Sequence, residues 1–222
     1  MRLARCRGGG LAILGNAPGR STKIINSTIS YNVSTYAMGG AAIGSPVAAI
    51  YNSTIAFNSA AVTIRSKFSD TFAFSPGLHV WSSKLYMQST LLANNTYGAS
   101  NTDNDFSSYA TSSVESHNLV LATKSAVSVD TIVGACPILG SLRFNGGPTQ
   151  TIALQSHSPG IDQGNNVFYN GTTTGVAEDQ RGVFLDPTPY LYPRASGSAA
   201  DIGAYEINQA DIIFTSNFEG CP

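Results

Sequence analysis

Short stretches of alternating apolar and polar residues recur along the first hundred residues of this chain. The octapeptide at 25–32, INSTISYN, returns at 51–58 as YNSTIAFN and at 87–94 as MQSTLLAN. Thr28, Thr54 and Thr90 occupy the same place in the three copies. A period of two over a few residues, rich in β-branched and aromatic side chains, is typical of short β-strands. Each copy therefore predicts one short strand with one buried side.

The spacing of the copies indicates a solenoid. The shared threonine returns after 26 and then 36 residues, and repeats of about 20–50 residues are typical of chains that stack one unit on the next. Such a length accommodates three short strands and three turns but no long helices. A unit of this size cannot bury its own apolar side and needs neighbours paired through a parallel ladder. We therefore expect an all-β fold, a parallel β-helix with three short strands per coil.

The aligned copies also predict which side chains meet. Ile29, Ile55 and Leu91 share one position and are expected to point inward on successive coils. The asparagines that end the three copies are expected to stack at one corner of the coils: Asn32, Asn58 and Asn94. A side-chain amide can donate to the turn of its own coil and to the amide of the next.

The character of the sequence changes near residue 136. Gly and Pro interrupt the apolar runs beyond that point, and carboxylates and arginines concentrate there. We expect coils over residues 1–135, an irregular C-terminal cap over 136–208 and a terminal tail over 209–222. A cap is needed because the last coil otherwise leaves an open hydrogen-bonding edge. The first residues read as a cut through a repeat, so we expect the chain to be the C-terminal part of a longer protein.

The composition argues against two classes of partner. Charged residues make up 11% of the chain, well below the ~25% of an ordinary globular protein. The net charge is −1 and no basic stripe is present, so nucleic acid is not an expected partner. No run of 18 apolar residues is present, so no transmembrane helix is expected.

Three cysteines, Cys6, Cys136 and Cys221, lie far apart in the chain. No C-x-x-C pair is present, which argues against a zinc site. The simplest expectation is that the cysteines are free thiols. The alternative is a single disulfide, Cys136–Cys221.

The last third of the chain contains four ordered motifs. They are FNGGPTQTIAL at 144–154, SPGIDQGN at 158–165, EDQRG at 178–182 and DIGAYE at 201–206. Together they resemble the C-terminal region of bacterial choice-of-anchor Q proteins, in which coils with the pattern NSTIS-x-N lead into such a cap. That family usually has Ala at the places of Gly160 and Gln163. The resemblance covers about residues 8–206 and implies a right-handed parallel β-helix, secreted or on a bacterial cell surface, with no established reaction.

Few residues of the coils are suited to catalysis. A glycosidase needs two carboxylates across the scissile bond, and a calcium-dependent lyase needs several oxygen ligands and a base. Asp70 is the single acid in the first hundred residues. Asp103 and Asp105 are alternative calcium ligands, although acids in a loop more often cap backbone N–H groups. No other cofactor is expected.

The charged residues of the cap are expected to be structural, with a catalytic cleft as the alternative. They are Asp162, Asp179, Arg181, Arg194, Asp201 and Glu206. Charge-assisted hydrogen bonds among them would hold a strand-poor region together. We expect a non-catalytic, secreted or surface-displayed β-helix for adhesion or envelope interaction, with carbohydrate as a candidate ligand. The alternative is a carbohydrate-active β-helix enzyme, a polysaccharide lyase or glycosidase, with active coils upstream or in the cap.

Overall fold

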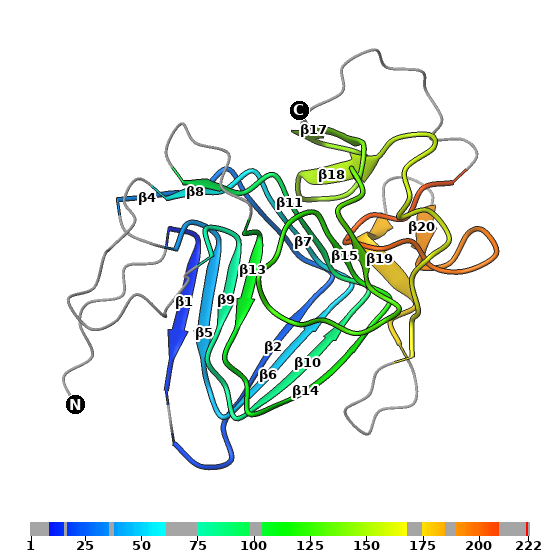
Figure 1. Ribbon diagram of the computed structural model, residues 1–222. Helices are drawn as coiled ribbons and strands as arrows, with labels where there is room; N and C mark the ends of the chain where they lie inside the picture. The colour runs from blue at the N-terminus through cyan, green and yellow to red at the C-terminus, as the bar shows by residue number, and fades with distance from the viewer. Residues whose placement is uncertain are drawn as a thin grey trace.

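The chain is an all-β protein in the computed structural model, with parallel sheets and two antiparallel strand pairs (Figure 1). The structure describes residues 9–15, 17–35, 38–60, 75–97, 104–167, 175–184, 190–208 and 221. No helix occurs within those ranges. The expectation of an all-β fold rich in parallel strands is confirmed.

Four parallel sheets form because the chain crosses the same places repeatedly. We call residues 9–35, 38–60, 75–97 and 104–133 passes 1 to 4, and the passes together the stack. Sheet I contains β1 (Leu11–Leu14), β5 (Ala41–Gly44), β9 (Leu78–Val80) and β13 (Phe106–Ser108). Sheet II contains β2 (Ser21–Ile25), β6 (Val47–Tyr51), β10 (Lys84–Gln88) and β14 (Ser112–Ser116). Sheet III contains β3 (Thr28–Ser30), β7 (Thr54–Ala56), β11 (Leu91–Ala93), β15 (Leu119–Val120) and β16 (Ile132–Val133).

Sheet IV is an addition to the three strands expected in each pass. It contains three strands of two residues each, β4 (Val33–Ser34), β8 (Ser59–Ala60) and β12 (Thr96–Tyr97). Figure 1 shows sheets I, II and III as the three sides of a triangle. An apolar core lies between them, and its members come from every pass: Ile24, Ala41, Ile43, Ala48, Ile50, Ile55, Leu78, Val80, Leu85, Met87, Leu92, Phe106 and Val120.

The register of the third pass corrects one expectation. Ile29 pairs with Ile55, as the aligned copies predict. Ile55 then pairs with Leu92, whereas Leu91 pairs with Thr54, one position away from the predicted match. Leu92 therefore points into the core and Leu91 points outward. Both faces of this part of sheet III are apolar, so the alternation that reveals register in the earlier copies is lost at Leu91 and Leu92.

The C-terminal region, residues 136–208, lies against the outer face of sheet III. It holds two antiparallel pairs, β17 (Leu139–Arg143) with β18 (Thr151–Leu154) and β19 (Glu178–Phe184) with β20 (Tyr190–Pro193). Leu91 and Leu119 pack there with Ile202 in a second apolar cluster. The contact reaches pass 1, where Asn26 Nδ2 donates to the Glu178 carbonyl at 2.7 Å.

The expected cap over the last coil is thus a side support that runs across the passes. The end of the stack is instead crossed by the segment that follows β15, drawn in front of the earlier strands in Figure 1. Thr123 forms a parallel bridge with Phe106, and Val127 packs on the inner core. The end of pass 4 therefore receives its cover from its own continuation.

A disulfide joins Cys136 to Cys221, 85 residues further along the chain. Free thiols at these two positions were the wrong expectation, and the alternative pairing is present. Sequence spacing gives no signal for it, because the half-cystines are brought together by the path of the C-terminal region. Cys6 lies outside the described residues, as does nearly all of the predicted tail.

Candidate functional site

Arg181 is the buried centre of the C-terminal region, 1% exposed. Its guanidinium carbon lies 4.0 Å from the ring centroids of both Tyr192 and Tyr205. Nε and Nη2 approach Asp179 Oδ2 at 2.9 and 2.8 Å. Nη2 also donates to the Glu206 carbonyl at 2.5 Å. Two ring faces and a carboxylate thus surround this cation.

The carboxylates of Asp201 and Glu206 accept backbone N–H groups. Asp201 Oδ1 accepts from Asp162 at 2.8 Å, and Oδ2 accepts from Ile207 at 2.7 Å. Glu206 Oε1 accepts from Ser196 at 2.9 Å, and Oε2 accepts from Asp201 at 2.8 Å. Both side chains are buried. They supply partners to backbone that no regular ladder satisfies.

Arg194 is the second buried cation of the region, 1% exposed. Its Nη2 donates to the carbonyls of Asp201 and Gly203 at 2.6 and 2.7 Å, whereas Nε and Nη1 have no hydrogen-bond partner. Burial lowers the pKa of Arg194. Burial also raises the pKa of Asp201 to about 6 and that of Glu206 to about 7, because desolvation outweighs their N–H donors and Arg194.

Of the six charged residues predicted for the cap, five are buried in one cluster and the sixth lies at its edge. Asp179, Arg181, Arg194, Asp201 and Glu206 are buried. Asp162 lies at the rim, on a cavity of about 270 Å³. The cavity is lined by Ser156, His157, Ile161, Asp162, Ser196, Gly197, Ile207 and Asn208. The other five charged residues do not line it.

The asparagine ladder exists, but its third member is Asn95 and not Asn94. Asn32 Nδ2 donates to Asn58 Oδ1 at 2.9 Å, and Asn58 Nδ2 donates to Asn95 Oδ1 at 2.9 Å. Each Nδ2 also donates to the carbonyl two residues before it. Asn94 has φ of 57° and occupies the left-handed turn position held by Phe57 in pass 2. The correction has the same cause as the shift at Leu91: pass 3 is one residue longer than the copies suggest.

Asp105 ends the ladder at pass 4. Its Oδ1 accepts from Asn95 Nδ2 at 2.7 Å and from the Asn95 backbone at 2.8 Å, and Oδ2 accepts from the Ala122 backbone at 3.1 Å. Asp105 is 2% exposed. A buried acceptor already engaged in this way is poorly placed to hold calcium, and Asp103 lies outside the described residues.

Glycine before the first strand of a pass leaves the space that the ladder needs. A Cβ on Gly10 would lie 2.7 Å from Asn32 Nδ2, and one on Gly40 would lie 2.9 Å from Asn58 Nδ2. The structure shows that close approach to the amide, and not a positive φ, requires them.

An aromatic group on the outer face of sheet I has no signal in the sequence. The His79 ring lies 5.0 Å from that of Trp81 and 5.6 Å from that of Tyr109. His79 Nδ1 is 2.5 Å from Ser107 Oγ. His79 is 3% exposed, and its burial lowers its pKa to about 4, so the ring is neutral at pH 7. Trp81 is half-buried and Tyr109 is 40% exposed. We call these four residues the aromatic wall.

A second group missed by the sequence lies at the end of sheet II. His117 Nδ1 is 3.3 Å from Asp130 Oδ2, with about 40% of each side chain exposed. Ser128 Oγ donates to Asp130 Oδ1 at 2.5 Å. Burial raises the pKa of Glu115, and Asp130 adds to that rise. An exposed pair of this kind stabilises little.

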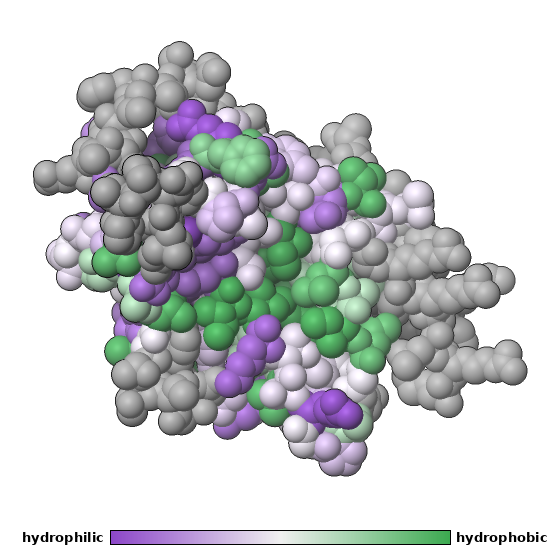
Figure 2. Space-filling model, turned by 180° about the vertical axis from the view of Figure 1, so that it is seen from behind, coloured by the Kyte–Doolittle hydropathy of each residue, from purple (hydrophilic) through white to green (hydrophobic). Residues whose placement is uncertain are grey.

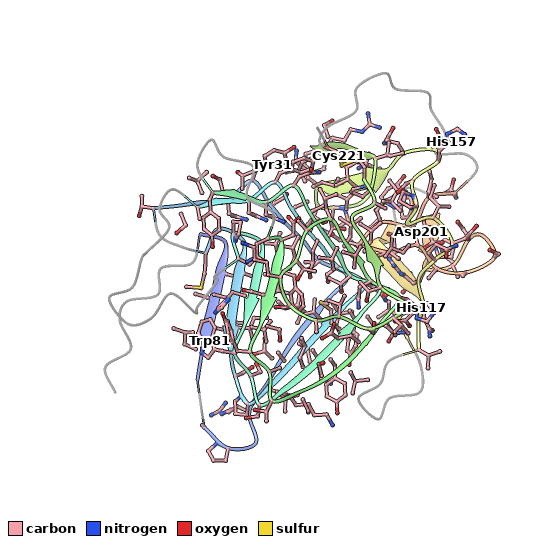
Figure 3. The ribbon with its side chains drawn as sticks, in the orientation of Figure 1. Tyr31, Trp81, His117, His157, Asp201 and Cys221 are labelled. Carbon is pink, nitrogen blue, oxygen red and sulfur yellow. A yellow bond between two sulfur atoms is a disulfide. The ribbon has the colours of Figure 1, made fainter. Side chains whose placement is uncertain are left out.

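Figure 3 shows how far these groups lie from one another. Trp81 and Asp201 project on opposite sides of the strands, so the aromatic wall and the charged cluster form separate sites. Within the described ranges, no three His, Cys, Asp or Glu side chains come close enough to hold a metal ion. The same part of the chain contains no helix able to cross a bilayer.

Comparisons with known proteins give no relative for this chain. Neither protein-family models, nor curated proteins, nor solved structures produced a match.

Proposed function

We propose that the stack is a right-handed parallel β-helix that serves as a non-catalytic binding scaffold. Sheets I and II each take one strand from every pass in the same order, and sheet III does the same with a second strand, β16, from pass 4, which supports a coil repeated along one axis. Parallel pairing in register supports the same arrangement, for example Ile24 with Ile50 and Thr28 with Thr54. The right hand follows from the general preference of parallel crossovers and from the choice-of-anchor Q resemblance.

One observation carries the non-catalytic part of the proposal. The buried acids of the described chain are already engaged: Asp105 by amides, Asp179 by Arg181, and Asp201 and Glu206 by backbone N–H groups. A glycosidase or lyase needs carboxylates that face a substrate across open space. Acids bonded to arginine and backbone match the structural alternative.

The aromatic wall is the surface that best fits a ligand. Trp81 and Tyr109 offer partly exposed rings that carry an indole N–H and a phenol hydroxyl, over the buried pair of His79 and Ser107. Gly44 on pass 2 makes room, because a Cβ there would lie 2.2 Å from Trp81 Nε1. Flat rings beside hydroxyl groups suit a neutral saccharide, whose C–H faces pack on aromatic rings while its hydroxyls form hydrogen bonds.

The site of action under this proposal is outside the cell, as a secreted or surface protein with an envelope polysaccharide as ligand. The Cys136–Cys221 disulfide supports it, because such bonds persist in oxidising compartments. The low fraction of charged residues, 11%, suits an uncharged partner.

Binding of neutral polysaccharides to the immobilised protein tests the proposal. Trp81→Ala and Tyr109→Ala are each expected to weaken binding about ten-fold or more, since a ring in a binding site contributes of the order of 1–2 kcal/mol. Tyr31→Ala is the matched control, an aromatic residue 45% exposed at a different corner. Equal loss in all three variants, or release of reducing ends by the wild type, would argue against a binding wall.

A carbohydrate-active enzyme remains the second candidate, and Glu115 is the observation that favours it. Its raised pKa beside Asp130 is what a general acid requires. Glu115→Gln should then abolish the release of reducing ends or unsaturated uronates. A wild-type protein that releases neither product removes this candidate.

A further inference from the structure

An acid ends one of the apolar columns of the inner core. Ile24, Ile50 and Met87 pair in register on sheet II and point into that core. Met87 pairs next with Glu115 on β14, so this carboxyl occupies the following inward position. The polarity is particular to this end of the stack, since a band of apolar residues crosses the opposite face of the molecule (Figure 2). Acidic side chains rarely take such positions without a partner, so packing alone does not explain this one.

Residues 124–131, which we call the strap, lie over this end of the core. They belong to the segment that crosses in front of the earlier strands in Figure 1. The strap is fixed at its start, where Ser125 Oγ accepts from the Ser108 backbone at 2.9 Å, and the chain beyond it enters sheet III as β16. Val127 packs on the inner core. Within the described chain no backbone hydrogen bond joins residues 126–130 to a strand, so side chains hold the middle of the strap.

Two acids and a histidine meet where the strap covers β14. Asp130 Oδ2 lies 3.3 Å from His117 Nδ1, and Asp130 Oδ1 accepts from Ser128. Glu115 is half-buried, and its Oε2 atom is buried without a hydrogen-bond partner. Burial raises the pKa of Glu115; a hydrogen bond from Ser113 opposes that rise, and Asp130 adds to it. Ionisation of Glu115 would leave a buried anionic oxygen without a donor beside a second acid.

The other charged and titratable side chains of the elements around Glu115 do not face it. Lys84 and Tyr86 on β10 lie on the outer face of sheet II, where the ammonium sits 4.8 Å from the centre of the ring. Lys124 is exposed at the start of the strap. The strands β13 and β15 carry no titratable residue. The charge on Glu115 therefore depends on Asp130 and on the histidine beside it.

We propose that the strap is a pH-operated cover, which closes over the end of the core when Glu115 is protonated and lifts when Glu115 ionises. Protonation removes the repulsion between Glu115 and Asp130, and in acid a protonated His117 attracts Asp130 as well. Ionisation reverses the first effect and favours access of water to Oε2, which the closed strap excludes. Lifting exposes Val127 and the core side chains on which it packs. The device depends on neither saccharide binding at the aromatic wall nor a catalytic role of Glu115.

Hydrogen exchange of the full chain, read as protection factors at pH 5 and pH 8, tests the proposal. Glu115 holds its proton more tightly under the closed strap than in water, where its pKa is 4.5. Closure is therefore most favoured below that value and weakens as pH rises through the raised pKa. Protection of the strap should fall about ten-fold or more between the two conditions, since one pKa unit corresponds to a factor of ten. The strands of sheets I, II and III should keep their protection.

Three variants locate the switch. Glu115→Gln cannot ionise and should keep the protection of the strap constant between the two conditions. Glu178→Gln replaces a half-buried acid of the C-terminal region, and as the matched control it should behave like the wild type. His117→Asn suits the left-handed φ of 51° at that position and should reduce the pH dependence without abolishing it.

Several results would overturn the proposal. They are equal protection of the wild-type strap at both pH values, a pH dependence that Glu115→Gln retains, and a loss of protection that extends through sheets I, II and III. Abolition of the pH dependence by His117→Asn or Glu178→Gln would place the switch elsewhere. If Glu115→Gln unfolds early, Glu115→Met continues the apolar column from Met87 and supplies the same comparison.

Discussion

The stack and the C-terminal region satisfy their buried polar groups by opposite means. In the stack, uncharged side-chain amides form most of these hydrogen bonds. Asn58 alone donates to Asn95, to the Ile29 carbonyl and to the Ala56 carbonyl. In the C-terminal region, charged side chains take this role, and Arg181 and Asp179 form an ion pair that is almost completely buried.

The difference follows from repetition. Passes 2 and 3 each provide an amide acceptor one strand spacing away, about 4.8 Å, so a short amide reaches its partner without any charge. The Asp105 carboxylate takes that place in pass 4. The C-terminal region has no repeated neighbour. A guanidinium that spreads several donors in a fork can instead connect distant backbone segments. Charge is thus concentrated where regular pairing is absent, and the region is the one that a single substitution should damage most.

The largest expected effect comes from Arg181→Ala. It leaves the Asp179 carboxylate buried without its cation, and breaking a buried pair costs roughly 3–5 kcal/mol. Denaturant unfolding should show that loss, and binding of a hydrophobic dye should rise as Leu91 and Leu119 lose their cover. Arg143→Ala is the control, since Arg143 bonds Asn145 on the surface. A wild-type melting curve for Arg181→Ala would show that the cluster does not hold the region in place.

Removal of the disulfide should rank second. A bond between residues 85 apart restricts the unfolded chain, and losing it costs about 2–4 kcal/mol. Cys136→Ser and Cys221→Ser should each lower the melting temperature of the protein, and reduction of the wild type should reproduce the effect. An unchanged melting temperature after complete reduction would contradict the role of this bond as a tie.

Asn58→Ala should cost about 2 kcal/mol, because it deprives Asn32 and Asn95 of a partner inside the ladder. Asn94→Gly is the matched control, one residue before the third ladder position, because glycine tolerates the left-handed φ of 57° there, and it should cost much less. Chemical denaturation of the two variants compares them directly. A larger loss in Asn94→Gly would restore the alignment expected from the sequence.

The smallest effect concerns pH. The pKa of Glu206 is raised to about 7, so the folded state binds more protons than the unfolded state between pH 4.5 and 7. Its contribution therefore weakens as pH rises, by about 1 kcal/mol between pH 6 and pH 8. His79, with its lowered pKa, acts in the opposite sense. The difference between wild type and Glu206→Gln removes the His79 contribution. If that difference stays constant from pH 6 to pH 8, Glu206 does not titrate as described.

The comparison also explains which expectations succeeded. In β3 and β7 a single isoleucine stands between small residues, so alternation reveals strand, face and register, as at Ile29 and Ile55. In pass 3 the outer face of β11 is covered as well, and two adjacent leucines hide the register by one residue. The sequence motifs predicted that four charged residues gather in one region: Asp179, Arg181, Asp201 and Glu206. The aromatic wall was not predicted, because His79 and Tyr109 come from different passes.

By itself the sequence determined that the chain is built from short parallel strands, that asparagines form a ladder along it, and that its charges belong to a different region. These are local properties, set by alternation and repeat length. Tertiary structure alone decided that the C-terminal region supports the side of the stack and that Cys136 meets Cys221. Those outcomes depend on which surfaces far apart in the chain fit each other, and periodicity within a single repeat carries no information about such contacts.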